Sequence, residues 1–206
     1  FGGAGLASTP VIDYRTYNDH REGGDIHMIV HQFSTRQRLV NANGHADNHV
    51  MQVGGQWNFI EGQDDLGHLF RQMDFWIRNI QADTLESDPA LRVVRNKPAS
   101  LTDSCWDTAG ETTELIEEPL AFNSETRCGQ LYPSYQSPRQ IAGAPLANDI
   151  VSCQLKRIDI TDYAISFTTD EYQQLLDIFS EGVCDWSRGD SSGSRHQGAW
   201  KSLGPS

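Results

Sequence analysis

The fold is indicated first by the stretch Pro10-Val11-Ile12-Asp13-Tyr14-Arg15-Thr16-Tyr17-Asn18-Asp19. Its β-branched beginning predicts a short strand at residues 11–14. The loop after that strand carries a carboxylate, Asp19, several residues beyond the carboxyl end of the strand. Ligand sites of open α/β sheets form at the carboxyl ends of the strands. Asp19 is therefore the first candidate for a functional residue.

An amphipathic helix, a second strand and a longer amphipathic helix are predicted to follow. Apolar residues recur with a helical period over residues 25–40, and over residues 64–80 with the strongest apolar face of the chain. The first face comprises Ile26, Ile29, Val30, Phe33 and Val40, and the second Leu66, Leu69, Phe70, Met73, Trp76, Ile77 and Ile80. Between the helices, residues 49–53 predict a strand that ends at Gly54-Gly55. The second helix should pack on the sheet.

The remainder of the chain predicts a loop-rich extension rather than a second sheet domain. Six prolines and weak periodicity occupy residues 81–150. A helix over about residues 168–181 is indicated by a capping box, Thr168-x-x-Glu171, and by a stop at Gly182. We therefore divide the chain at residue 80. Residues 1–80 form a sheet core, and residues 81–206 form an extension whose helix packs on that core.

The four cysteines form two pairs that are close in sequence, which predicts the disulfides Cys105–Cys128 and Cys153–Cys184. Neither spacing is the C-x-x-C of zinc ribbons or redox dithiols. Loops of these lengths would each contribute on the order of 3 kcal/mol in the chain-entropy account. Because disulfides persist in oxidising compartments, a secreted protein is expected, extracellular or periplasmic.

Composition excludes several functional classes. The chain has 206 residues, of which 37% are hydrophobic, so it can bury a core. Its net charge of -12 argues against nucleic acid and against an anionic membrane surface as partners. No apolar run approaches the roughly 20 residues that span a bilayer. The expected partner is therefore neutral, cationic or small.

Several sequence phrases carry a resemblance to a known family. They are Asn41-Ala42-Asn43-Gly44-x-Ala46-Asp47-Asn48-x-Val50, Met73-Asp74-x-Trp76, Val94-Arg95-Asn96-Lys97-Pro98-Ala99, Ala142-Gly143-Ala144-Pro145-Leu146-Ala147-Asn148-Asp149, Cys153-Gln154-Leu155-Lys156 and Gly182-Val183-Cys184-Asp185-Trp186-Ser187. Together they resemble the C-terminal portion of a family of secreted bacterial proteins of unknown function with a tannase-like α/β-hydrolase fold. The resemblance implies an α/β fold class. The chain would supply the last strands and helices of an α/β-hydrolase sheet, followed by a disulfide-held extension.

The resemblance also implies a Ser, acid and His triad, in that chain order. The nucleophilic serine of this class lies on a sharp strand-to-helix turn, usually within G-x-S-x-G, and no such segment lies upstream of Asp19. The chain begins at Phe1 without an initiator Met, followed by a glycine-rich stretch. We therefore expect the serine on a missing or separate N-terminal chain of the same precursor.

Asp19 would be the triad acid, which stays ionised and orients the imidazole. The alternative is an ordinary loop or helix-cap carboxylate. Asp13 and Asp25 are weaker candidates, because Asp13 lies inside the predicted strand and Asp25 begins a predicted helix.

Seven histidines compete for the role of base. His68 is favoured because it lies after the last predicted strand, near the start of the closing helix. His27 is the main competitor, since it lies eight residues from Asp19. His49 comes third because it lies at the beginning of its strand, which is normally the wrong end for the base. Each has an ordinary structural alternative.

Two further site hypotheses rest on spacing. His27 and His31 are four residues apart, and on one helix face they could hold zinc, although no H-E-x-x-H pattern supports this. Neither a metal nor another cofactor is part of the main prediction. Trp57 lies in the glycine-rich loop after the second strand and is the tryptophan placed to touch substrate, whereas Trp76 is expected in the core.

The sequence therefore predicts a serine hydrolase half that acts on a small or polymeric ester, or on an amide, with Asp19 and His68 or His27 in this chain. The rival is a non-catalytic binding or structural subunit of a larger complex. The exposure of apolar strand edges in the isolated chain tests whether it evolved with a partner, because such edges are not normally left open.

Overall fold

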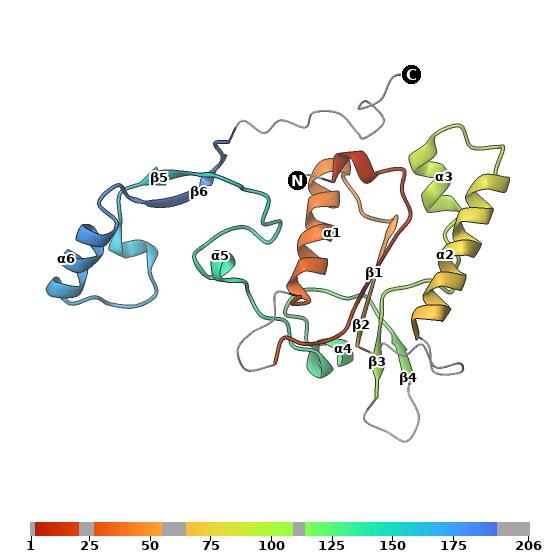
Figure 1. Cartoon of the computed structure of the whole chain (residues 1–206), viewed down its shortest axis with the longest axis horizontal. Helices are drawn as coiled ribbons and strands as arrows, with labels where there is room; N and C mark the ends of the chain where they lie inside the picture. Colours follow the sequence, from red (N-terminus) through yellow and green to blue (C-terminus); the bar gives the residue numbers. More distant parts are fainter. Residues whose placement is uncertain (1–2, 21–26, 55–64, 109–113, 193–206) are drawn as a thin grey trace.

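The computed structural model describes residues 3–20, 27–54, 65–108 and 114–192. These form a four-stranded sheet with helices on both faces, and a separate two-stranded sheet beyond α5 (Figure 1). The sheet order is β1-β2-β3-β4, with three parallel strands and an antiparallel edge strand. The strands are β1 (Val11–Arg15), β2 (His49–Gly54), β3 (Ser104–Asp107) and β4 (Glu114–Glu117). The fold class is thus mixed α/β, as predicted.

Strand β2 is the centre of the core, and all six of its residues are buried. Alternate side chains of a strand point to opposite faces, so β2 contributes to two apolar clusters. On one face Met51 and Val53 pack with Ile29, Phe33 and the buried disulfide Cys105–Cys128. On the other face Val50 packs with Trp76, Val93 and Leu101. Strands that are buried on both faces consist of almost continuous runs of apolar residues, and residues 50–53 come close to this pattern.

The helices that supply those clusters are α1 (Val30–Asn43) on the first face, and α2 (Asp65–Ala82) with α3 (Pro89–Arg95) on the second (Figure 1). The chain moves in the same direction across the sheet from β1 to β2 and from β2 to β3. Because the connecting helices cover opposite faces, the two crossovers have opposite hands. Parallel crossovers are right-handed in about 98% of cases, so one of these two departs from the rule.

Helix α1 begins at Val30 and not at Asp25, which corrects the predicted boundary. The helix runs on to Asn43, where Gly44 adopts a left-handed conformation (φ 80°) and donates its N–H to the carbonyl of Val40. The shift changes the buried face. Leu39 is fully buried, whereas Val40, predicted on the apolar face, is 38% exposed.

Strands β3 and β4 come from the segment that was predicted as loops. Four-residue strands such as Ser-Cys-Trp-Asp carry too little alternation to be recognised locally. β3 joins the sheet by pairing with the carboxyl half of β2, from Gln52↔Ser104 to Gly54↔Trp106. The segment after residue 80 therefore completes the same sheet that the first residues begin.

Both predicted disulfides are present, with Cα–Cα distances of 5.7 Å for Cys105–Cys128 and 5.4 Å for Cys153–Cys184. The second joins β5 (Cys153–Lys156) to β6 (Val183–Asp190), which pair antiparallel. The remaining elements are the 3-10 turns η1 (Ala4–Leu6) and η2 (Ile160–Asp162) and the helices α4 (Arg127–Leu131), α5 (Pro138–Ile141) and α6 (Thr169–Ile178).

Helix α6 has the predicted capping box, in which Thr168 and Glu171 bond each other's backbone N–H. However, none of its residues is buried, and it lies with β5 and β6 apart from the sheet (Figure 1). The packing of this helix on the core, expected from its apolar face, is not observed in the described residues. None of the described helices is long and apolar enough to cross a membrane.

Candidate functional site

Asp19 lies beyond the carboxyl end of β1, at the edge of the sheet where it was expected. Its carboxylate accepts the backbone N–H of Ile29 at 3.0 Å (Oδ1) and 3.3 Å (Oδ2), immediately before α1 begins. The positive end of a helix dipole favours a negative charge at this position. The carboxylate is therefore held at a helix start, which is compatible with both the triad role and the capping alternative.

A pocket of about 360 Å³ opens at the same edge. Its lining residues are Tyr14, Arg15, Thr16, Asn18 and His27. His27 therefore lines the same pocket as Asn18, the residue next to Asp19. A small group brought to this pocket would lie beside the loop that carries the candidate acid.

His68 lies in the first turn of α2 and is half-buried. The described residues show no hydrogen bond or ion pair between His68 and Asp19. Residues 55–64, which lead into this helix and include Trp57, are outside the described residues, as is Asp25. The roles of His68, His27 and Trp57 therefore stay predictions.

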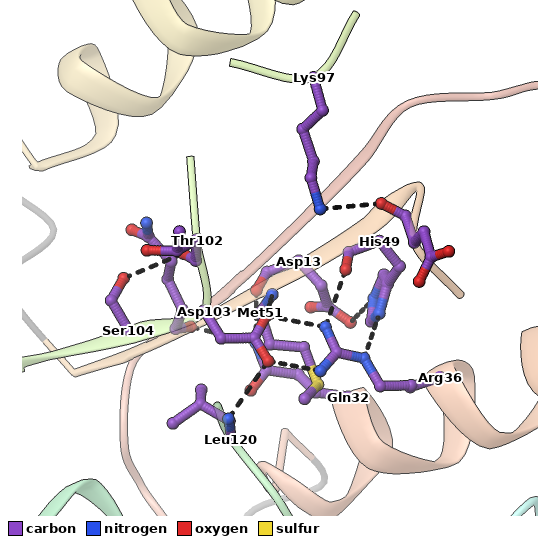
Figure 2. A network of polar contacts seen from close by, with 12 residues as sticks. Asp13, Gln32, Arg36, His49, Met51, Lys97, Thr102, Asp103, Ser104 and Leu120 are labelled. Atoms are coloured by element: carbon purple, nitrogen blue, oxygen red, sulfur yellow. Dashed lines mark hydrogen bonds and ion pairs between the residues drawn. The ribbon is translucent and has the colours of Figure 1, made fainter. Parts of the chain in front are cut away.

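A network of charged side chains occupies the opposite, amino edge of the sheet (Figure 2). The guanidinium of Arg36, from α1, makes two bonds to the carboxylate of Asp103, and the one from Nη2 measures 2.8 Å. The same carboxylate accepts the backbone N–H of Met51 at 2.9 Å and that of Leu120 at 3.2 Å. One carboxylate therefore joins α1, β2, the start of β3 and the segment after β4.

His49 belongs to this network and not to the carboxyl edge. Its side chain is fully buried, and its Nδ1 accepts from Nε of Arg36 at 3.2 Å. Its Nε2 faces Oδ2 of Asp13 at 3.8 Å. The structure therefore does not bring His49 to Asp19, and its surroundings support a structural role.

Asp13 is held ionised by its neighbours. Burial by itself would raise the pKa of Asp13, but the contact with His49 and the charge of Arg15 outweigh it and keep that pKa below its ordinary value. The side chain of Gln32 donates to the carbonyl of the same residue, and also to that of Gln52 at 3.0 Å. These contacts explain how a strand residue under α1 can be an aspartate.

An open cavity of about 800 Å³ lies beside this network. Arg36 and Asp103 line it together with rim residues such as Lys97, whose Nζ donates to the carbonyl of Asp47 at 2.9 Å (Figure 2). Two of its lining residues, Arg36 and Asp103, already pair with each other. Of the two cavities described here, the one of about 800 Å³ therefore lies at the edge where α/β enzymes do not place their chemistry.

Comparison with protein families decides the relationship suggested by the sequence. Residues 1–194 match the model of a tannase-like family of unknown function. The chain belongs to this family. Searches of curated proteins and of solved structures gave no match. Membership in a tannase-like family indicates a hydrolase-related domain.

A serine within G-x-S-x-G does occur far downstream of Asp19 in this family member. The letters are Gly189-Asp190-Ser191-Ser192-Gly193. Ser191 directly follows β6, a strand of the two-stranded sheet. Its Oγ donates to the carbonyl of Ser152 at 2.9 Å. A nucleophile of this class lies on a strand-to-helix turn and precedes the acid in the chain. Ser191 meets neither condition.

The zinc hypothesis loses its geometric basis. His27 precedes α1, which starts at Val30, so His27 and His31 do not share a helix face. Within the described ranges, no group of three or more His, Cys, Asp or Glu side chains is arranged to hold a metal ion.

Trp76 lies in the core as expected, and its Nε1 donates to the carbonyl of Val93 at 2.9 Å.

Proposed function

We propose that this chain is the acid-bearing and histidine-bearing part of a secreted serine esterase. The observation that carries the proposal is Asp19, a carboxylate fixed beyond a parallel strand in a member of a tannase-like family. In this role Asp19 stays ionised, holds a histidine in the correct tautomer and stabilises the imidazolium formed during attack. His68 and His27 are the candidate bases, and the substrate is an ester.

The nucleophilic serine would come from a separate polypeptide of the same precursor, docked along the outer edge of β1. β1 is the first strand in the sheet order, and all five of its residues are half-buried, whereas β2 is fully buried. Open strand edges are normally covered or paired. A parallel strand added here would carry its following turn to the carboxyl edge, beside Asp19 and the smaller pocket.

Extracellular or periplasmic action is part of the same proposal. The two disulfides support it, because such bonds persist in oxidising compartments. Their loops of 23 and 31 residues give the cross-links an appreciable effect on stability in that setting.

The test is fluorophosphonate labelling of the native preparation, followed by peptide mapping of every chain that co-purifies. We expect the label on a serine outside this chain. Asp19→Asn keeps an acceptor for the N–H of Ile29 but loses the negative charge, and should slow turnover of p-nitrophenyl acetate about 10³- to 10⁴-fold. Asp74→Ala on the exposed side of α2 is the matched control, and Ser191→Ala should leave labelling unchanged. Full activity in Asp19→Asn would remove the acid from the proposal.

The second candidate function is a binding subunit without catalysis. It is favoured by the apolar side chains that the region around β5, β6 and α6 exposes. These are Val151, Leu155, Ile160, Tyr163, Ile165, Ile178 and Phe179, between 39% and 70% exposed. Exposed patches of this kind mark interaction surfaces. Absence of any labelled serine in folded, intact native material would favour this function over the esterase.

A further inference from the structure

The carboxyl edge of the sheet is partly covered by a segment that the sequence did not connect with it. We call residues 120–133 the arch. Its base is tied by the disulfide Cys105–Cys128, in which both cysteines are buried, and by the N–H of Cys128, which donates to Glu118 Oε1 at 2.6 Å. Phe122 adds an edge-to-face contact with Phe33 of α1 (ring centroids 5.9 Å apart). The arch is therefore fixed to the sheet and to α1.

Tyr132, near the end of the arch, lies over the carboxyl ends of β2 and β3. Its hydroxyl donates to the carbonyl of Trp106. A Cβ added to Gly54, the last residue of β2, would come within 2.3 Å of that hydroxyl oxygen. Gly54 also has φ 83°, a conformation that favours glycine. The end of β2 is thus shaped to accept this tyrosine.

Tyr17 connects the arch to the loop of Asp19. Its ring packs edge-to-face on Tyr132 (centroids 5.1 Å apart) and stacks on the imidazole of His20 (5.2 Å). Its hydroxyl donates to the carbonyl of Pro133 at 2.8 Å. The loop that carries Asp19, residues 16–20, is therefore held at two points: Tyr17 on the arch and Asp19 at the start of α1.

We propose that Tyr17 is a positioning residue for the reaction, which holds the loop of residues 16–20 against the arch and so orients the carboxylate of Asp19. The inference rests on the proposed function. Burial, reinforced by the charge of Asp19, raises the pKa of Tyr17 to about 12. The hydroxyl therefore remains a donor to Pro133 throughout the range of pH in which an esterase is assayed.

Two substitutions separate the hydroxyl from the ring. Tyr17→Phe keeps both ring contacts and removes the bond to Pro133, and should lower both kcat for p-nitrophenyl acetate and the fluorophosphonate labelling rate about 5- to 10-fold. Tyr17→Ala also removes the ring contacts and should lower both kcat and the labelling rate about 100-fold, the loss expected when a catalytic group is misplaced by about 1 Å. KM should be unchanged in Tyr17→Phe. Tyr172→Phe, a half-buried tyrosine of α6, is the matched control.

The experiment uses the native complex, with the melting temperature of each variant measured beside its kinetics. A 5- to 10-fold loss of kcat in Tyr17→Phe at an unchanged melting temperature supports the positioning role. If the kcat of Tyr17→Phe equals that of Tyr172→Phe, or falls only as far as its lowered melting temperature explains, the positioning role is overturned. An inactive Asp19→Asn would then still support the proposed function. Wild-type activity in Asp19→Asn would remove both.

Discussion

Asp103 offers the most direct test of what holds the sheet together. The substitution Asp103→Ala leaves the N–H groups of Met51 and Leu120 without their acceptor, in residues that are 0% and 8% exposed. It also removes the ion-pair partner of Arg36. Each orphaned buried amide costs about 1–3 kcal/mol. The side chain of Arg36 is 24% exposed, so its guanidinium can regain water and the loss of its partner is discounted.

The expected total is about 3–5 kcal/mol of unfolding free energy, a large part of the roughly 5–15 kcal/mol that a domain of this size has. Urea unfolding followed by tryptophan fluorescence, with disulfides intact, measures it. The matched control is Asp74→Ala, which breaks an exposed i,i+4 pair with Arg78 and should cost about 0.5 kcal/mol or less.

A double substitution sharpens the reasoning. Arg36→Met with Asp103→Leu also leaves the N–H groups of Met51 and Leu120 without an acceptor, so it should destabilise about as much as Asp103→Ala even though no unpaired charge remains. If Asp103→Ala costs no more than Asp74→Ala, then the bonds to Met51 and Leu120 do not carry the stability assigned to them here.

Two further predictions concern pH and redox. Because the pKa of Asp13 lies below its ordinary value of 3.8, its ionised form stabilises the fold above that pH, and this contribution is lost as the pH falls through the lowered pKa. In Asp13→Asn, the unfolding free energy should therefore decrease less steeply as the pH is lowered into the acid range. An unchanged pH dependence would contradict this. Stepwise reduction with mass mapping should open Cys153–Cys184 first, because its cysteines are half-exposed whereas Cys105 and Cys128 are 0% and 2% exposed; simultaneous opening would show that burial does not protect the first disulfide.

Local patterns were sufficient for several elements. β1 and β2 were recognised from short β-branched or apolar runs, and α2 from its period, with boundaries within one or two residues of Val11–Arg15, His49–Gly54 and Asp65–Ala82. The capping box at Thr168 predicted the start of α6. These signals succeed because they depend on neighbours within one or two turns of the chain.

The candidate site was predictable only in part. Asp19 was found because a carboxylate after a strand is a local feature, and its place at the carboxyl edge follows from the direction of β1. Tyr17 was not singled out, because its partner Pro133 is 116 residues away. The start of α1 was misplaced because the carboxylate of Asp19, ten residues upstream, bonds the N–H just before the helix.

By itself, the sequence determined β1, β2, α2 and the start of α6, the pairing of the cysteines and the family. The tertiary structure alone decided that β3 and β4 complete the sheet, that His49 lies at the amino edge, and that Arg36 meets Asp103 across 67 residues. The physical reason is range. Propensity, capping and amphipathic period act between near neighbours, whereas strand order and buried charge pairs depend on contacts that no local pattern encodes.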